Sequence, residues 1–293
     1  MSYRSVFRPD LFAGQHVVVT GGGSGIGRCT AHELAALGAH VALVGRRAEK
    51  LAAVAAEIAE AGAITPTTHP CDIRVEEAVQ RCVGTILEAH GRIDGLVNNA
   101  GGQFAAPLKD MSQKGWETVI RTNLTGGFLM ARECFNRSME RHGGVIVNVI
   151  ADMWMSMPTM GHSGAARAGM LNFTMTAAVE WAYAGVRVNA VAPGWIASSG
   201  MATYPEEQRE RISNLWRLVP LKRIGTEAEV SAAIVFLLSE AAAFISGSCL
   251  RIDGAAPNAK SSVPMPDHDR SKPYYGFPLE RPPEFLRRDD RGA

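Results

Sequence analysis

The feature that most constrains the fold is a glycine-rich segment, Thr-Gly-Gly-Gly-Ser-Gly-Ile-Gly, at residues 20–27. It directly follows a β-branched run, His16–Thr20, and directly precedes a stretch with helical composition. Glycines suit a sharp turn where the backbone must approach a pyrophosphate, and the N–H groups that open the next helix then hold the anion. A merely flexible loop would lack this strand-before and helix-after context, so we predict a dinucleotide-binding loop. Its candidate contact residues are Thr20, Gly21, Gly23, Ser24, Gly25, Ile26 and Gly27.

From residue 16 to about 253, short β-branched runs alternate with longer stretches rich in alanine and leucine. In one such stretch, Leu51, Val54, Ala55 and Ile58 share one helical face. This alternation predicts a single α/β domain of the Rossmann type, with a doubly wound parallel sheet and helices on both faces. We expect this domain to span residues 1–255, with a Pro-rich arm at 256–293 that is extended or disordered. The runs are His16–Thr20, His40–Val44, Gly95–Asn98, Val145–Ile150, Val186–Ala192 and Cys249–Ile252.

The composition excludes several classes of protein. With 30 basic and 29 acidic residues the net charge is +1, which offers no footprint for nucleic acid and no basic membrane anchor. No window approaches the roughly 18 consecutive apolar residues of a membrane span, and the first residues do not resemble a secretory signal. The five cysteines are far apart and the histidines lack metal-ligand spacing. We therefore expect a cytoplasmic protein with reduced thiols and no metal site.

Cofactor choice should be decided where the second run ends. An acidic residue there would bind the adenosine ribose hydroxyls and favour NADH. This chain instead has Arg46 and Arg47, and a guanidinium group can bind a 2′-phosphate with two hydrogen bonds. Although both arginines could simply be solvated, we expect NADPH as the cofactor in preference to NADH.

Several separate motifs resemble the short-chain dehydrogenase/reductase family. They are the glycine-rich loop, Asn98-Asn99-Ala100-Gly101, Asn123 in a long helix and Asn189-Ala190-Val191-Ala192-Pro193-Gly194. The resemblance implies that Asp72 contacts the adenine, that Asn99 braces the sheet and that Asn123 holds a water near the active site. It also implies that Ile196 and Ser198 position the nicotinamide carboxamide, and that the protein is a homotetramer. Further cofactor contacts implied in this way are Ile73, Ala100, Gly101, Pro193 and Gly194.

The chain departs from this family at the catalytic residues. The family pattern is Tyr-x-x-x-Lys with a serine thirteen residues before the tyrosine. Aligning the helix end puts Ser163 at the tyrosine position, Arg167 at the lysine position and Ile150 at the serine position. The usual proton donor and its hydroxyl partner are therefore both absent. Asn123, Ser163 and Arg167 are the predicted catalytic residues, with Arg167 also holding the nicotinamide ribose.

This altered set resembles a narrower group, the peroxisomal trans-2-enoyl-CoA reductases. The similarity lies in Gly101-Gly102-Gln103-Phe104, Lys114-Gly115-Trp116, Asn123-Leu124-Thr125-Gly126, the segment 162–169 and Pro266-Asp267-His268-Asp269. The chain ends without the Ser-Lys-Leu signal for import into peroxisomes, which agrees with the cytoplasmic expectation.

The substitutions disfavour alcohol oxidation more than reduction of a conjugated C=C bond. An aliphatic hydroxyl such as Ser163 is a poor base, and Arg167 stays protonated. Hydride addition to an enoyl thioester instead needs a hydrogen-bond donor at the thioester oxygen, which Ser163 could provide. We therefore expect an NADPH-dependent reductase of trans-2-enoyl-CoA or similar conjugated acyl substrates. Two alternatives stay open, a dehydrogenase of a lipophilic alcohol or aldehyde and a non-catalytic dinucleotide-binding sensor or scaffold.

Three features have two interpretations each. His162 is a tempting acid, but neighbouring helical residues point about 100° apart, so a capping or subunit-interface role is favoured. Tyr204, in the segment expected to cover the substrate, is either a phenol donor or a packed aromatic. The run Met153-Trp154-Met155-Ser156-Met157, with Met160, either lines an acyl pocket or packs in the core.

Overall fold

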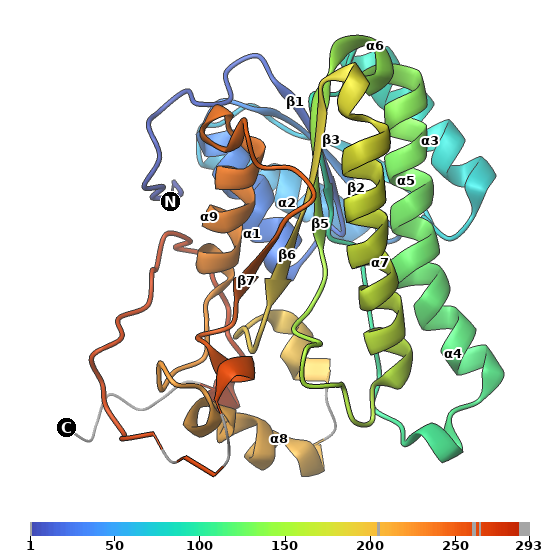
Figure 1. Cartoon of the computed structure of the whole chain (residues 1–293). Coiled ribbons are helices and arrows are strands. Elements are labelled where there is room, and N and C mark those ends of the chain that lie inside the picture. Colours follow the sequence, from blue (N-terminus) through green and yellow to red (C-terminus); the bar gives the residue numbers. More distant parts are fainter. Residues whose placement is uncertain (1, 204–205, 260–261, 264, 287–293) are drawn as a thin grey trace.

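The computed structural model describes residues 2–203, 206–259, 262–263 and 265–286. Its seven parallel strands form one sheet in the order β3-β2-β1-β4-β5-β6-β7, with helices on both faces (Figure 1). This arrangement confirms the predicted Rossmann-type fold. The strands are β1 His16–Thr20, β2 His40–Gly45, β3 Thr67–Pro70, β4 Gly95–Asn98, β5 Gly144–Val149, β6 Val186–Pro193 and β7 Cys249–Ile252.

The six expected runs match six of these strands, and β3 was not among them. Its sequence, Thr-Thr-His-Pro, is short and polar, and the strand lies at the edge of the sheet. An edge strand is covered less completely than an inner one, so it carries no run of buried β-branched residues that the sequence pattern could show.

Two helical layers enclose the sheet. Helices α1, α2 and α9 pack on one face through Leu34, Leu51 and Val230, whereas α3, α5 and α7 pack on the other. Side chains alternate along each strand, so that Val17 and Val19 of β1 lie in the first core and Val18 lies in the second. The helices are α1 Gly25–Ala36, α2 Ala48–Glu60, α3 Glu76–His90, α4 Gln113–Ile120, α5 Gly126–Cys134, α6 Glu140–His142, α7 Gly161–Glu180, α8 Glu206–Ser213 and α9 Glu227–Leu238.

The helix between β4 and β5 contains two π-helical segments. The first, η2 Arg121–Thr125, joins α4 to α5, and the second, η3 Phe135–Met139, joins α5 to α6. Single π-turns within α-helices are frequent at functional sites because they turn a side chain out of the regular register. Asn123, one of the predicted catalytic residues, lies at the centre of the first segment.

The described part of the C-terminal arm is an extended segment that packs against its own chain. Phe277 lies in a small apolar cluster with Tyr3, Cys29 and Ala228. The arm also hydrogen bonds through its backbone, because the carbonyl of Leu279 accepts from Arg28 in α1 at 3.1 Å. These contacts join the arm to the N-terminal segment and to helices α1 and α9.

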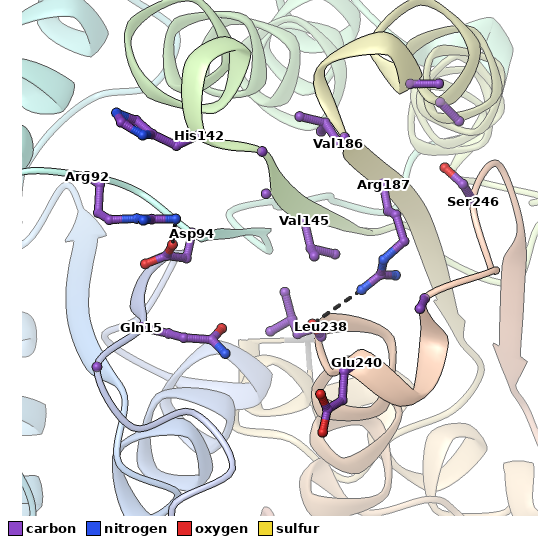
Figure 2. Close-up of a pocket in the computed structure, with 17 residues that line it drawn as sticks. Gln15, Arg92, Asp94, His142, Val145, Val186, Arg187, Leu238, Glu240 and Ser246 are labelled. Carbon is purple, nitrogen blue, oxygen red and sulfur yellow. Dashed lines mark hydrogen bonds and ion pairs between the residues drawn. The ribbon is translucent and has the colours of Figure 1, made fainter.

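A broad depression lies at the end of the sheet where β4, β5 and β6 begin. It encloses about 770 Å³ and is lined by Gln15, Arg92, Asp94, His142 and Arg187, among others (Figure 2). Arg187 donates to the carbonyl oxygens of Leu237 at 2.9 Å and Ser239 at 3.1 Å. Its guanidinium therefore caps the C-terminal end of α9, a structural role far from the glycine-rich loop.

No helix in the described parts of the chain is both long enough and apolar enough to cross a bilayer.

Candidate active site

The glycine-rich loop lies at the carboxyl end of β1, where the strand order reverses between β1 and β4. Such a switch point is where open α/β sheets bind their ligands. Gly21 and Gly25 take positive φ angles of 67° and 57°, which side-chain-bearing residues rarely adopt. Helix α1 begins at Gly25, and its N-cap residue Ser24 makes no side-chain capping bond. The first N–H groups of α1 are therefore open to an anion.

Asn99 and Thr20 connect this loop to the neighbouring strand. The Asn99 side chain donates to the Thr20 carbonyl at 3.0 Å. The Thr20 hydroxyl accepts from the backbone N–H groups of Asn99 and Ala100, both at 3.0 Å. These bonds fix the ends of β1 and β4 side by side, so the two loops that follow the strands form one wall. The cleft beside this wall is lined by residues that include Gly21, Gly23, Ser24, Ile73, Ala100 and Gly101.

The other end of this cleft is positively charged. Arg46 and Arg47 follow β2 and are exposed, and their guanidinium groups form no hydrogen bond to a described residue. The one carboxylate in the lining, Asp72, is paired with Arg74 at 2.6 Å, and this guanidinium lowers the pKa of Asp72 to about 2. With Lys50 also in the lining, the cleft carries a clear excess of positive charge. This positive charge suits an anionic group better than an uncharged ribose hydroxyl.

Ser163 lies in the first turn of α7 and is fully buried. Its hydroxyl donates to Gln103 Oε1 at 2.7 Å. Gln103 was noted in the sequence only as part of a resemblance and was not predicted as a site residue. The loop that carries Gln103 follows β4 and has no regular period, so no pattern in the sequence indicates that this side chain faces α7.

Arg167 lies one helical turn after Ser163. It donates from Nη1 to the carbonyl of Val149 at 2.7 Å, at the end of β5. A Cβ atom on Gly101 would lie only 2.6 Å from Arg167 Nη2, so the guanidinium packs against the loop after β4. Its Nε is buried and has no hydrogen-bond partner among the described residues. Burial lowers the pKa of Arg167 to about 10, which still leaves the group charged at pH 7.

Asn123 bonds to the same loop, the one that follows β4. Its side chain bonds Gly102 in both directions, accepting from the N–H at 2.9 Å and donating to the carbonyl at 2.9 Å. The structure therefore brings Asn123, Ser163 and Arg167 around one loop, residues 101–103. Each of the three contacts a different residue of that loop: Gly102, Gln103 and Gly101 respectively.

His162 is buried beside this network, at the start of α7. Its Nδ1 accepts from the N–H of Ser163 at 2.7 Å, and its ring packs edge-to-face on Phe104 with centroids 4.5 Å apart. Burial lowers the pKa of His162, and a hydrogen bond with the backbone of Met160 opposes this shift. Its Nε2 is buried and has no hydrogen-bond partner among the described residues.

The residues that flank the site divide into core and surface. Ile150 is buried in a small cluster with Met170. Of the methionine run, Met153 packs against that cluster, whereas Met155 is 66% exposed. On the far side, Ile196 is buried and pairs with Gly225, and Ser198 lies near Gly25 of the phosphate loop. Tyr204 lies outside the described residues.

The chain is similar to proteins of one large family. A family model described as enoyl-(acyl carrier protein) reductase matches residues 21–255. A probable 2,4-dienoyl-CoA reductase of Bacillus subtilis is 37% identical over 242 residues, which cover 81% of this chain and 94% of that protein. The peroxisomal 2,4-dienoyl-CoA reductase of Danio rerio is 32% identical, with 87% and 85% covered. A solved structure, the citronellol catabolism dehydrogenase AtuB of Pseudomonas aeruginosa PAO1, is 64% identical with a TM-score of 0.78 and covers 87% of this chain and 100% of its own.

Proposed function

This chain belongs to the short-chain dehydrogenase/reductase family of NAD(P)-binding oxidoreductases, and we propose that it uses NADPH to reduce a C=C bond conjugated to a thioester carbonyl. Substrates of this class are trans-2-enoyl-CoA and 2,4-dienoyl-CoA. The relatives named as dienoyl-CoA reductases support this chemistry over the full length of the domain. Membership of this family also weighs against the non-catalytic sensor or scaffold.

The observation that carries the proposal is the pair Ser163 and Arg167. Within the described residues, the catalytic network contains hydrogen-bond donors and a cation but no phenol or amine that could accept a proton from an alcohol. Reduction of a conjugated acyl group needs a hydrogen-bond donor instead of a base. Negative charge develops on the thioester oxygen, and a positioned donor stabilises that charge.

The residues present fit a bound dinucleotide. The uncapped start of α1 would hold the pyrophosphate, and the unpartnered Nε of Arg167 leaves a donor for the ribose hydroxyls beside the nicotinamide. When bound, the reduced nicotinamide supplies a hydride to Cβ of the substrate. Ser163 would then donate to the thioester oxygen in place of Gln103 Oε1, which occupies the acceptor position in this structure.

The dipole of α7 and the charge of Arg167 also stabilise the negative charge that develops on the thioester oxygen. Ser163 lies in the first turn of α7, where the helix dipole is positive, and Arg167 adds a full positive charge one turn later. The electron pair that moves from the C=C bond to the oxygen returns when Cα takes a proton from solvent. A trans-2-enoyl thioester then becomes saturated, whereas a 2,4-dienoyl thioester keeps one of its two C=C bonds. Asn123 acts on this chemistry indirectly, because it holds the loop that carries Gln103.

NADPH consumption with a medium-chain trans-2-enoyl-CoA or 2,4-dienoyl-CoA tests the proposal directly. We expect substrate-dependent loss of nicotinamide absorbance, and a fall of about 10²- to 10³-fold in kcat for Ser163→Ala because one oxyanion donor is lost. Ser248→Ala is the matched control, since that serine is exposed and takes no part in the hydrogen bond between Ser163 and Gln103. An unchanged rate in Ser163→Ala would remove Ser163 from the mechanism, and no turnover by the wild-type enzyme would refute the substrate class.

Selection of NADPH through Arg46 and Arg47 is a separate prediction. Replacing both with alanine should raise the KM for NADPH by at least about 10- to 100-fold, because at least one charged hydrogen bond of roughly 1.5–3 kcal/mol to the 2′-phosphate would be lost. The KM for NADH should change little, and Arg141→Ala, which removes an exposed arginine of α6, should leave both constants unchanged. An equal rise in KM for NADPH and NADH would show that these arginines do not bind the 2′-phosphate.

Oxidation of a lipophilic alcohol is the second candidate function. It is favoured by the 64% identity to a protein named citronellol catabolism dehydrogenase. Citronellol-dependent reduction of NADP⁺ or NAD⁺ by the purified enzyme would support it. A parallel assay with an enoyl thioester separates the two candidate functions by showing which substrate is turned over. We expect the thioester, because Ser163 has no evident route for removing an alcohol proton.

We also propose that the protein is a cytoplasmic homotetramer. Apolar side chains on the outer surface of α5 and α7 support an assembled state, because Phe128, Met175 and Val179 are 36%, 44% and 78% exposed. A face of this kind is usually covered by another protein surface.

A further inference from the structure

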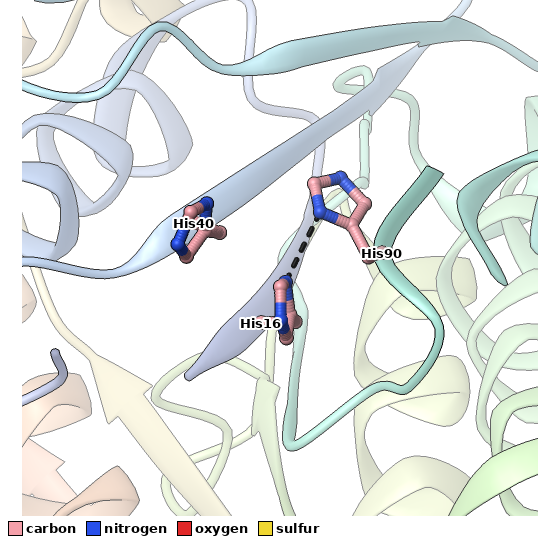
Figure 3. Close-up of side chains that lie close together, drawn as sticks. All are labelled: His16, His40 and His90. Atoms are coloured by element: carbon pink, nitrogen blue, oxygen red, sulfur yellow. Dashed lines mark hydrogen bonds between the residues drawn. The ribbon is translucent and has the colours of Figure 1, made fainter. Parts of the chain in front are cut away.

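Three histidines gather at the amino-terminal edge of the sheet (Figure 3). The cleft beside the glycine-rich loop lies at the opposite end of the strands. His16 begins β1 and His40 begins β2, and the parallel register pairs them directly across the two strands. His90 is the last residue of α3 and faces the same two rings. The three residues are far apart in sequence, so their spacing gave no sign of a shared site.

The ring nitrogens are close enough to share one ion. One nitrogen from each ring lies within 4.8 Å of the other two. The Nδ1 atoms of His16 and His90 are 3.1 Å apart, and the rings of His16 and His40 stack with centroids 4.8 Å apart. Two nitrogens bound to one tetrahedral Zn²⁺ at about 2.0–2.1 Å would themselves be roughly 3.3 Å apart. Small rotations of the side chains would therefore bring all three into coordination.

Polar neighbours hold His90 in a suitable orientation. Its Nε2 lies 2.9 Å from the hydroxyl of Thr67, and that hydroxyl lies 2.8 Å from Nε2 of His69. The partners of Nε2 leave Nδ1 facing His16. Histidines that bind metals are commonly fixed in this way, with the second ring nitrogen bonded to a polar group.

The charge state of the cluster also suits a cation. Burial and the neighbouring imidazoles lower the pKa of His90 to about 4, and burial lowers that of His16. Neutral imidazole is the form that binds metals. Asp94 adds a nearby carboxylate, which accepts from the His16 N–H at 2.8 Å and pairs with Arg92.

We propose that His16, His40 and His90 form a binding site for one Zn²⁺ ion, with water as the fourth ligand. Three imidazoles are typical ligands for zinc and for other late first-row divalent metals. The site would tie the starts of β1 and β2 to the end of α3. It would act on stability and leave the chemistry at Ser163 to the other end of the sheet, so it is independent of the proposed reaction.

Metal binding is measured on the full-length, tag-free protein after treatment with a chelator. Titration with Zn²⁺ should give one equivalent at sub-micromolar affinity and raise the melting temperature. Co²⁺ should give the visible absorption bands of a tetrahedral nitrogen-ligated site. His16→Ala and His90→Ala should each lose this binding, and Thr67→Val should weaken it by about 10- to 100-fold through loss of the polar partner of His90.

The control is His142→Ala, which removes an exposed histidine of α6 that lies outside the cluster. It should bind Zn²⁺ as the wild type does. If either cluster variant fails to fold, His40→Gln keeps the test decisive, and NADPH binding reports that its nucleotide site is intact. A wild-type protein that binds no zinc, or cluster variants that bind it as tightly as the wild type, would overturn the proposal.

Discussion

Replacing Gly27 with alanine is expected to abolish measurable binding of the dinucleotide while the sheet still folds. A Cβ atom at this position would lie 2.4 Å from the carbonyl oxygen of Gly21 and 2.4 Å from Asn99 Nδ2. Neither can yield without moving the loop, because Gly21 O belongs to the backbone and the Asn99 side chain is held by Thr20. Displacement of a phosphate loop by even 1 Å should weaken NADPH binding by about 100-fold or more.

The control for this variant is Gly84→Ala in α3. There the nearest neighbour of an added Cβ is the flexible end of Arg137 at 3.3 Å, and alanine is the better helix former. We expect Gly84→Ala to keep full affinity for NADPH in a fluorescence titration. For Gly27→Ala we also expect a loss of about 1–3 kcal/mol in the free energy of unfolding, as for other overpacked positions. Normal cofactor affinity in Gly27→Ala would mean that the loop relaxes freely.

The fold around the glycine-rich loop was predictable because its constraints are local. The turn from β1 into α1 needs glycine at fixed offsets, and the residues after β2 are contiguous in sequence. The alternation of buried runs and amphipathic stretches likewise defines a parallel sheet without reference to distant contacts. Only strand β3 was not predicted, because an edge strand with the sequence Thr-Thr-His-Pro contains no apolar residues that would indicate it.

The arrangement of the side chains that we propose to be catalytic was less predictable, because it depends on contacts across the fold. Ser163 and Arg167 were found from their register on a helix, but their partners lie in another loop and at the end of β5. Gln103 and the carbonyl of Val149 belong to irregular or backbone positions that no periodicity marks. The histidine cluster was also not predicted from the sequence. His16 and His40 come together only through the parallel pairing of β1 with β2.

A comparison of two buried arginines gives the sharpest test of the catalytic assignment. Arg167 and Arg187 both bond backbone carbonyls, and burial lowers the pKa of each. Arg187 caps the end of α9, whereas Arg167 also has an unpartnered Nε. One arginine thus has only structural contacts, and the other has a donor left for the nicotinamide ribose.

Arg167→Ala should therefore lower kcat/KM by about 10- to 150-fold, since one charged hydrogen bond of roughly 1.5–3 kcal/mol would be lost from the bound cofactor. The loss should include a higher KM for NADPH, and Arg167→Lys should recover part of it because the charge returns without the planar fork. Arg187→Ala should instead lower the melting temperature and leave the kinetic constants of the folded fraction near the wild-type values. The reverse pattern, with Arg167→Ala active but unstable, would make Arg167 a structural residue and leave Ser163 to act without it.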